Sequence, residues 1–338
     1  MQQLRIATCK HMSDNVSKIL DVLMIGCGQI AGGFDEGNPD SARSHAGAYR
    51  RHTGFRITAC VDPDVTRRKA YMAHWGVPEG FDRLDDANAA EITFDVVSVC
   101  SPTEQHADDL MMLLKSQPRA VFCEKPIAED IGAARDLVAA FEAAKIPLAV
   151  NHLRRWDARL AKLREEVAAG DWGEIRSAVG LYTKGILNNG THLVDLMQFL
   201  LGPMNIVASG PRREDGYPGD PTVDAILTLA NGATAHLVGG DSRDYALFEL
   251  TIITEKGVIA LEEAGYTIRI RTVRDSARYA GYRELDNAAI SQSGLEDAMT
   301  NAVTDLYNAV QNGKQTASTG RSALAAHELC EQLRVCAP

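Results

Sequence analysis

Residues 21–31, DVLMIGCGQIA, decide the fold of the first part of the chain. The apolar run DVLMI is typical of a buried parallel strand, and a glycine motif follows it directly. In such a motif the first glycine permits a tight turn, the second lets the backbone approach a pyrophosphate, and the final alanine lets a helix pack closely. N–H groups at the helix start then face the phosphates, although glycines alone would also fit an ordinary turn. The predicted dinucleotide contacts are Gly26, Gly28, Gln29, Ile30 and Ala31.

Strands and helices alternate from this motif to about residue 150. Apolar runs predict strands at Arg56–Val61, Phe94–Cys100, Ala120–Cys123 and Leu148–Asn151. The stretches between them predict helices at His45–Arg51, Thr66–His74, Glu104–Lys115 and Ala128–Ala144. Such alternation indicates βαβ units and, because crossovers are right-handed, a doubly wound parallel sheet. We expect an α/β Rossmann domain over residues 21–150, after an N-terminal extension over residues 1–20.

The pattern changes in residues 151–338. Period-two alternation from Pro221 onward and the Asn231-Gly232 turn indicate the hairpins of an antiparallel sheet. Helices are expected at Ala158–Ala169, Thr191–Leu201, Leu295–Gln311 and Ser322–Val335. We therefore predict a second, α+β domain with a mostly antiparallel sheet, whose last helix could pack back on the first domain.

Composition excludes several classes of protein. The 338 residues carry 35 basic and 45 acidic side chains, a net charge of −10, which argues against nucleic-acid partners and a polybasic membrane anchor. The first 20 residues lack the apolar core of a signal peptide, and no apolar run reaches the ~20 residues of a membrane span. The seven cysteines form no CxxC pair and no His/Cys/Asp cluster has metal-ligand spacing, so we expect a cytoplasmic protein without a catalytic metal.

Asp62 follows the second predicted strand and is the candidate partner of the cofactor ribose. A carboxylate there accepts hydrogen bonds from the ribose hydroxyls and repels a 2′-phosphate, so NAD is favoured over NADP. Asp62 lies further from the glycine motif than usual, because Gly32–Ser44 reads as an insertion. Alternatively Asp62 only begins a turn, and Arg67 and Arg68 keep NADP possible.

Polar residues follow two further strands, at the edge where open α/β sheets bind ligands. Candidate cofactor contacts there are Ser101, Pro102, Thr103, His106, Glu124 and Lys125. Lys125 would place an ammonium beside the nicotinamide, able to hold or polarise a substrate oxygen. A cis bond before Pro126 would fix the direction of the lysine, although a Lys-Pro after a strand can also be a solvated turn.

Asn188 and His192 lie four residues apart and share a face if the helix has already begun. A histidine is a natural acid or base for proton transfer coupled to hydride transfer. The alternative is a capped core helix with a satisfied histidine. Candidate substrate contacts are Arg154, Trp156, Lys184, Asn188, Asn189 and His192, with a solvated helix start as the alternative for the first two.

Taken together, these segments resemble the Gfo/Idh/MocA family, named after glucose–fructose oxidoreductase, inositol dehydrogenase and rhizopine catabolism. The matching segments, in order, are GCGQIA (26–31), Asp62, VSVCSPTEQH (97–106), EKP (124–126), GDWGEI (170–175) and GTHLVD (190–195). The resemblance implies a Rossmann domain, then a domain with a large open sheet that often forms oligomers. It also implies hydride transfer between NAD(P) and a carbon of a sugar or polyol, with Lys125 as the active-site lysine and His192 as the acid or base.

One residue departs from the family pattern, because many members have Asp where this chain has Asn188. Asparagine can orient a substrate but cannot raise the pKa of the histidine by charge. The segment LNNGTHLVDL (187–196) is similar to that of members associated with nucleotide sugars. The candidate substrates are therefore sugars, polyols and nucleotide sugars. The alternatives are a relative that cleaves glycosides with NAD as a transient oxidant, and a dinucleotide-binding sensor without turnover. We expect a homo-oligomer, dimer or tetramer, with a small sugar-type substrate.

Overall fold

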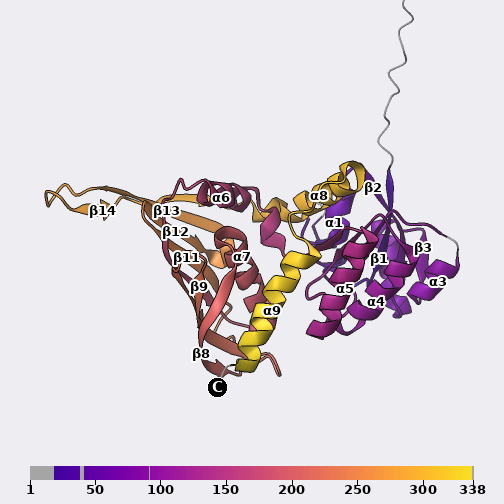
Figure 1. Cartoon of the computed structure of the whole chain (residues 1–338). Coiled ribbons are helices and arrows are strands. Elements are labelled where there is room, and N and C mark those ends of the chain that lie inside the picture. The colour runs from indigo at the N-terminus through magenta and orange to yellow at the C-terminus, as the bar shows by residue number, and fades with distance from the viewer. Residues whose placement is uncertain (1–18, 39–41, 91, 337–338) are drawn as a thin grey trace, which may run out of the picture.

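A computed structural model describes residues 19–38, 42–90 and 92–336, and it contains two domains, each built on one sheet (Figure 1). The predicted N-terminal extension lies outside the described residues except for its last two. Leu20 already belongs to the first strand, so the first domain begins one residue earlier than predicted.

The first domain has a six-stranded parallel sheet in the order β3-β2-β1-β4-β5-β6, which confirms the doubly wound Rossmann fold. Its strands are β1 (Leu20–Ile25), β2 (Phe55–Val61), β3 (Glu79–Phe81), β4 (Val96–Val99), β5 (Ala120–Cys123) and β6 (Leu148–Val150). Its helices are α1 (His45–Arg51), α2 (Val65–Trp75), α3 (Leu84–Ala89), α4 (Thr103–Ser116) and α5 (Ile131–Ala144). The sequence analysis did not predict β3 and α3, because both are too short to show a periodic pattern of apolar residues.

The insertion Gly32–Ser44 loops out of the first helix without interrupting its hydrogen bonds. A single helical turn follows the glycine motif, and the carbonyls of Ile30 and Ala31 then accept from the N–H groups of His45 and Ala46, at 3.0 and 2.9 Å. Helix α1 therefore continues that turn across the insertion. The motif keeps its packing on the sheet although the insertion separates it in sequence from the rest of its helix.

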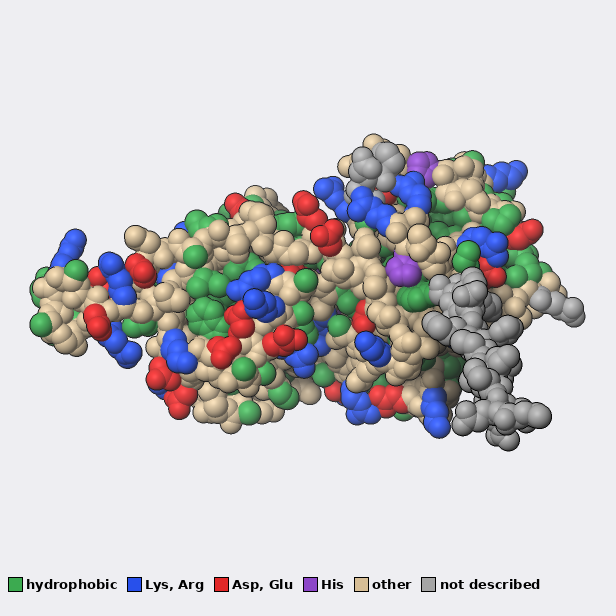
Figure 2. All heavy atoms as spheres, turned by 90° about the horizontal axis from the view of Figure 1, so that it is seen from above, with side chains coloured by type: hydrophobic (Ala, Val, Ile, Leu, Met, Phe, Trp, Pro, Cys, Tyr) green, Lys and Arg blue, Asp and Glu red, His purple; other side chains and the backbone are tan. Residues whose placement is uncertain are grey.

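The second domain has a nine-stranded sheet in the order β14-β13-β12-β11-β7-β10-β9-β8, with β15 beside β13. Its strands are β7 (Ile175–Tyr182), β8 (Met204–Arg213), β9 (Thr222–Leu229), β10 (Thr234–Gly239), β11 (Phe248–Thr254), β12 (Gly257–Glu262), β13 (Thr267–Asp275), β14 (Arg283–Leu285) and β15 (Ala289–Gln292). Only β7 and β10 pair in parallel, so the sheet is mostly antiparallel, as expected. The end of β13 and β14 form a narrow arm that projects from the body and carries side chains of both signs (Figures 1 and 2).

Helices cover one face of this sheet and join the two domains. They are α6 (Ala158–Ala168), α7 (Thr191–Leu201), α8 (Ala298–Asn312) and α9 (Gly320–Cys336), with the short elements η2 (Leu153–Trp156), η3 (Gly185–Gly190), η4 (Glu263–Gly265) and η5 (Leu295–Asp297). A further short turn, η1 (Gly33–Asp35), belongs to the first domain. The apolar side of α8 lies in the core of the first domain, and α9 packs on both α5 and α7. No helix of the described residues is long and apolar enough to cross a membrane.

Candidate active site

The glycine motif lies at the carboxyl edge of the first sheet and borders a cavity of about 350 Å³. Gly26 has φ +87°, and a side chain there would place its Cβ 2.5 Å from the carbonyl oxygen of Cys100, so only glycine fits. No atom lies within 4 Å of the position a Cβ would take on Gly28. The backbone is therefore open to close approach by a phosphate at the predicted point.

The motif also leaves backbone donors for a pyrophosphate. The N–H groups of Gly28, Gln29 and Ile30 have no acceptor among the described residues, whereas Gly32 N–H already bonds to the Gly28 carbonyl at 3.2 Å. Unpaired N–H groups at a helix start are the usual donors to phosphate oxygens. The donor set fits the diphosphate of a dinucleotide.

Asp62 lies in the same cavity, only 2% exposed. One carboxylate oxygen accepts from Cys27 N–H and the other from Asp64 N–H, each at 2.9 Å, so Asp62 also holds the glycine turn. Arg67 reaches Asp62 at 3.3 Å and Asp64 at 3.4 Å. Arg67 thus faces two carboxylates, and the second guanidinium there, Arg68, donates to the Asp62 carbonyl and pairs with Asp82. The three carboxylates exceed the two guanidiniums, so this part of the cavity is negative.

His106, a predicted cofactor contact, is 1% exposed and is not among the residues that line the cofactor cavity. Its ring nitrogens lie 2.9 Å from the Ser101 carbonyl and 2.7 Å from the Pro126 carbonyl, and a neutral imidazole can donate to only one of them. His106 therefore joins the loops after β4 and β5. Ser101 donates to Asp109 at 2.6 Å, and Ser101 and Pro102 line the cavity. Thr103 begins α4 beside them.

Lys125 connects the two domains across the cleft. Its Nζ donates to the side-chain oxygen of Asn188 at 3.0 Å and to the Asn188 carbonyl at 3.1 Å. The peptide bond between Lys125 and Pro126 is cis. Burial lowers the pKa of Lys125, and the charges of Glu124 and Asp220 oppose that shift. The structure thus brings together Lys125 and Asn188, which are 63 residues apart in sequence.

Glu124 is fixed behind the lysine and does not project freely toward a cofactor. One carboxylate oxygen accepts from His45 at 3.0 Å and from Asn151 at 2.6 Å. Burial alone would raise the pKa of Glu124, but the hydrogen bond and charge of His45 and the hydrogen bond of Asn151 leave it below its usual value. The other ring nitrogen of His45 hydrogen-bonds to the Ser98 hydroxyl, which in turn hydrogen-bonds to the Tyr49 hydroxyl. A chain of buried, hydrogen-bonded side chains therefore lies behind Lys125.

His192 lies in the first turn of α7, and its ring has no hydrogen-bond partner among the described residues. The ring stands edge-on to His152, with 5.5 Å between centroids. Burial and the positive charges of Lys125 and Arg154 hold the pKa of His192 well below its usual value, so the ring is neutral at neutral pH. Burial also lowers the pKa of His152, whose Nδ1 lies 3.9 Å from Asp195.

The segment that carries Asn188 is a π-helix, η3, rather than the first turn of the α-helix that the four-residue spacing suggested. The Asp220 carboxylate accepts from the N–H groups of Leu187 and Asn188, at 2.8 and 2.9 Å. Burial raises the pKa of Asp220, and these two N–H groups oppose the shift. Asp220 was missed from the sequence because no motif connects it to the site, although it shapes the π-helix and lies near Lys125.

The other predicted substrate contacts have different positions. Trp156 is 5% exposed, donates to Asp305 at 2.8 Å and packs on Phe122, so the core of the first domain, and not a substrate, surrounds it. Asn189 donates to the carbonyls of Thr183 and Leu247, at 3.0 and 3.1 Å, and so ties η3 to its neighbours.

Arg154 and Lys184 border the second domain. The Arg154 guanidinium lies 3.6 Å above the ring of Phe248 and donates to the Ala264 carbonyl at 2.7 Å. Burial lowers its pKa to about 10. Lys184 is half-buried just before η3, and its ammonium has no partner in the described part of the chain. Of the two, Lys184 has the free cationic group.

The arrangement can hold a substrate oxygen between an ammonium, an amide and a neutral imidazole. No cluster of three or more metal-ligating side chains occurs in residues 19–38, 42–90 and 92–336. The ammonium, the amide and the imidazole can supply hydrogen bonds and proton transfer, next to a cavity suited to a dinucleotide.

Family models match both domains. The model for the oxidoreductase family with an NAD-binding Rossmann fold matches residues 20–152, and the Gfo/Idh/MocA C-terminal domain matches residues 181–260. The chain belongs to the Gfo/Idh/MocA family of oxidoreductases. It is an NAD(P)-dependent dehydrogenase or reductase acting on CH–OH groups.

Individual relatives agree with this assignment. Inositol 2-dehydrogenase of Rhizobium meliloti (strain 1021) is 27% identical over 85% of this chain and 91% of its own length. D-Apiose dehydrogenase of Paraburkholderia graminis is 26% identical over 91% of this chain and 85% of its own. A 3-ketoreductase from Actinomadura kijaniata in complex with NADP has the same fold, with a TM-score of 0.75, 20% identity, and coverage of 94% and 97%.

Proposed function

We propose that this enzyme transfers a hydride between NAD and a secondary hydroxyl carbon of a sugar, polyol or nucleotide sugar. The observation that carries the proposal is the contact of Lys125 Nζ with Asn188, beside the neutral ring of His192. The contact supports a role for an ammonium and an amide, next to an imidazole, at the carboxyl edge of a dinucleotide-binding sheet. That edge is where a nicotinamide and its substrate meet in this class of fold.

The residues divide the proton chemistry between them. A bound nicotinamide would supply the acceptor for the hydride that leaves the substrate carbon. Lys125 donates a hydrogen bond to the reacting oxygen and stabilises its negative charge, and Asn188 orients the neighbouring hydroxyl. A ring nitrogen of His192 takes the hydroxyl proton during oxidation and returns it during reduction. The lowered pKa of His192 keeps that nitrogen free to accept the proton at neutral pH.

The cofactor corner favours NAD over NADP. A 2′-phosphate would meet Asp62 and Asp64, whose charges together with that of Asp82 exceed the two charges of Arg67 and Arg68. Asp62 is buried and cannot turn away, since it holds the N–H groups of Cys27 and Asp64. The like charges therefore weaken NADP binding unless Arg67 is released from them.

The outer face of the second sheet supports the proposal of a homo-oligomer. Alternation buries Leu227, Leu237 and Ile252 but exposes Val238 and Ile253, 43% and 40% respectively. Val238 and Ile253 lie on β10 and β11, on either side of β7, and exposed apolar side chains on one sheet face are typical of a surface covered by a second copy. We therefore propose that this face is the contact between subunits.

The test is turnover with the substrates of the named relatives. Formation of NADH is followed by absorbance with myo-inositol, D-apiose, methyl glucosides and uridine-diphosphate sugars. Lys125→Met and His192→Ala are expected to lower kcat by at least ~10²-fold on the best substrate, the low end for general acid–base groups. Lys162→Met, at an exposed lysine of α6, is the control.

Near-normal turnover of both active-site variants would contradict the assignment. Cleavage of a glycoside without net NADH would favour the transient-oxidant alternative. Tight NAD binding with no turnover on any compound would favour a sensor.

A further inference from the structure

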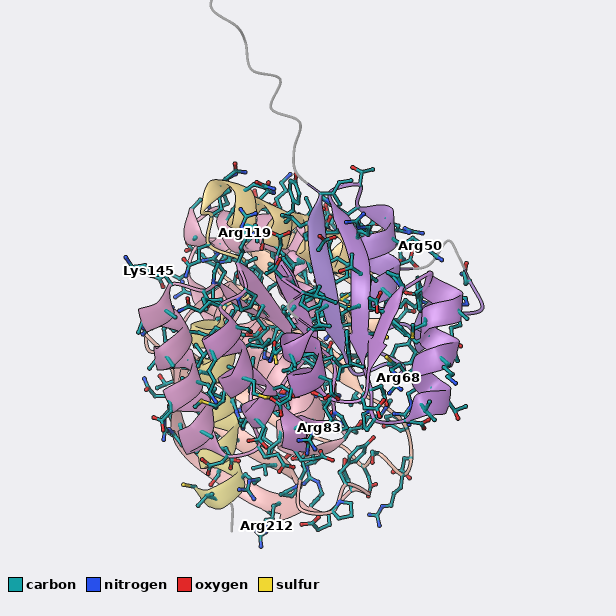
Figure 3. All side chains as sticks on the ribbon, turned by 90° about the vertical axis from the view of Figure 1, so that its right-hand side faces the viewer. Arg50, Arg68, Arg83, Arg119, Lys145 and Arg212 are labelled. Carbon is teal, nitrogen blue, oxygen red and sulfur yellow. The ribbon has the colours of Figure 1, made fainter. Side chains whose placement is uncertain are left out.

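The cavity that borders the ends of α5 and α8 lies on the opposite edge of the first sheet from the cofactor. Its volume is about 540 Å³, against about 350 Å³ for the cofactor cavity. Arg119 precedes β5 and Leu148 begins β6, so the cavity opens at the amino ends of these parallel strands. Figure 3 shows Arg119 and Lys145 at one end of the first domain and Arg68 and Arg83 at the other. The cavity is therefore separate from the active site.

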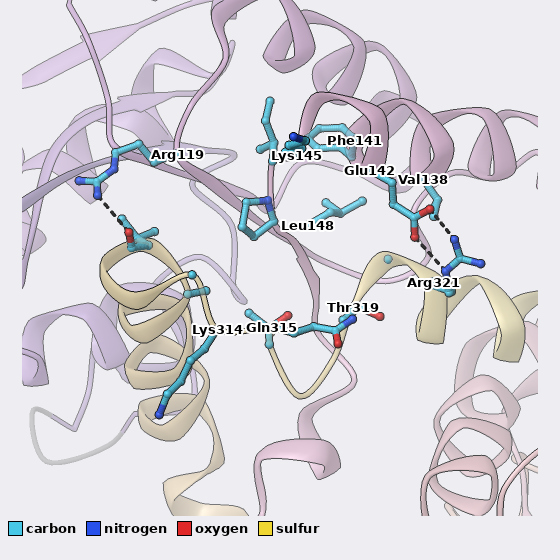
Figure 4. A pocket seen from close by; sticks show the side chains of 17 residues that line it. Arg119, Val138, Phe141, Glu142, Lys145, Leu148, Lys314, Gln315, Thr319 and Arg321 are labelled. Atoms are coloured by element: carbon cyan, nitrogen blue, oxygen red, sulfur yellow. Dashed lines mark hydrogen bonds and ion pairs between the residues drawn. The ribbon is translucent and has the colours of Figure 1, made fainter.

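The rim of this cavity is cationic, although the whole chain is acidic. Four cationic side chains and one carboxylate line it, and Figure 4 shows the cations on different sides of the opening. Two cations are already engaged, since Arg321 pairs with Glu142 and Arg119 donates to the Val310 carbonyl at 3.0 Å. Lys145 and Lys314 have no partner for their ammonium groups among the described residues. The cavity therefore keeps two free positive charges.

The interior of the cavity is apolar. Val138 and Phe141 of α5, Ile146, and Leu148 of β6 line it on the side of the first domain, and Val310 lines it from α8. Pockets of 300–1,000 Å³ with apolar walls and a few polar groups are the usual form of small-molecule sites. The size and lining fit a ring system or a short alkyl group.

The first turn of α9 closes one side of the cavity. Thr319, Gly320 and Arg321 line it there, and the N–H group of Arg321 has no acceptor among the described residues, whereas Gly320 is engaged by the antiparallel bridge between Thr319 and Ala149. The positive end of this 17-residue helix adds to the two free lysines. The helix start, the cations and the apolar interior together favour an anion attached to an apolar body.

We propose that this cavity is a second binding site, for a small amphipathic anion with an aromatic or alicyclic body and a single sulfonate, carboxylate or phosphate group. The apolar body lies against Phe141 and Leu148, and the anionic group lies toward Lys145, Lys314 and the start of α9. The ligand joins α5 to α9, and the body of α9 packs on η3 and α7, which carry Asn188 and His192. The site is independent of the substrate assignment.

The test uses 8-anilinonaphthalene-1-sulfonate as the probe, with saturating NAD so that the cofactor site is filled. Fluorescence titration gives its Kd for the wild type and for Lys145→Glu/Lys314→Glu. Lys69→Glu/Lys162→Glu makes the same charge change at exposed lysines elsewhere. N-Phenyl-1-naphthylamine, which has the same rings without the sulfonate, measures the part of binding that needs the charge.

The expected result is saturable binding that the first double variant weakens at least about tenfold, because two attractions become repulsions. The control pair is expected to change the Kd by less than about twofold, and the uncharged probe to lose no affinity in the first variant. Equal weakening by both pairs, or no effect of Lys145→Glu/Lys314→Glu, would overturn the proposal. Circular dichroism confirms that each variant is folded.

Discussion

Asn188 is a neutral amide beside Lys125 and His192, and its replacement by aspartate would change the pKa values of both groups. Lys125 Nζ lies 3.0 Å from the Asn188 side-chain oxygen, and the Lys125 charge lowers the pKa of His192, after burial. Asn188→Asp adds a negative charge that stabilises both cations and so raises both pKa values. The acidic limb of kcat/KM for oxidation, which reports neutral His192, should move to higher pH. Asn188→Ala is the control, because it removes the amide without adding charge.

A second residue-scale prediction concerns the cofactor corner. Asp64 caps α2 through the N–H groups of Thr66 and Arg67, and it is also one of the two carboxylates on Arg67. Asp64→Ser keeps the capping oxygen but removes the charge. The ratio of the Kd for NADP to the Kd for NAD should fall by about fivefold. Asp85→Ser, in the first turn of α3, should leave the ratio unchanged in the same titration.

Sequence could predict the residues of the site that belong to local motifs, and it missed those that other elements bring in. Lys125, Asn188 and His192 each follow a strand or open a helix, where the chemistry of a residue shows in its context. His45, His152 and Asp220 gain their positions only through tertiary contacts. His45, for example, meets Glu124 across 79 residues. The sequence also could not show that Trp156 packs in the core of the first domain or that His106 joins two loops, because proximity in sequence does not reveal which way a side chain points.

The insertion Gly32–Ser44 depends on one buried carboxylate. Asp35 is fully buried and accepts from Arg43 N–H at 3.0 Å and from the N–H and hydroxyl of Ser44, at 2.8 and 2.5 Å. Asp35→Ala leaves these donors unpaired beside the start of α1, which should lower the free energy of unfolding by about 2–4 kcal/mol. Urea denaturation measures the loss. Glu36→Ala, at the exposed neighbour, should cost less than about 0.5 kcal/mol.

At the scale of elements, the sequence could predict the alternation of strands and helices in the first domain, because its strands are buried on both faces and most of its helices are long. The central strand of the second sheet, β7, was missed although Ile175–Tyr182 alternates in burial. Its neighbours β10 and β11 come far later in sequence, so no hairpin turn marks it. The π-helix η3 was equally invisible, since its form depends on the Asp220 carboxylate that lies 32 residues away.

Assembly through the second sheet is a property of the whole molecule. Val238 and Ile253 lie on strands β10 and β11, on either side of β7, with their side chains on the outer face. Val238→Glu/Ile253→Lys places charges on that face, so light scattering should show a smaller species than the wild type. A mass equal to that of the wild type would place the subunit contact elsewhere. Lys69→Glu, at an exposed position of α2 in the first domain, changes the charge away from that face and is the control.

The dependence of stability on pH also belongs to the whole molecule. Burial lowers the pKa of four histidines in different elements, His52, His152, His192 and His327. In the unfolded chain each titrates near 6.5, so below that pH the unfolded state binds more protons and is favoured. The free energy of unfolding should therefore fall as the pH drops from about 7.5 toward 5.5, by at most ~1.4 kcal/mol per histidine and pH unit.

One variant distinguishes the contribution of a histidine to the pH dependence of stability from the contributions of the buried carboxylates. Burial raises the pKa values of Asp109 and Asp220, which makes the folded state bind protons more readily and opposes the histidine effect on acidification. His192→Gln removes one depressed histidine and leaves these carboxylates, so the slope of unfolding free energy against pH should become shallower. His74→Gln, at an exposed position of α2, is the matched control in the same urea titrations. A slope that His192→Gln leaves unchanged would show that the His192 ring is not held neutral by the fold, and the base proposed for hydride transfer would lose its physical support.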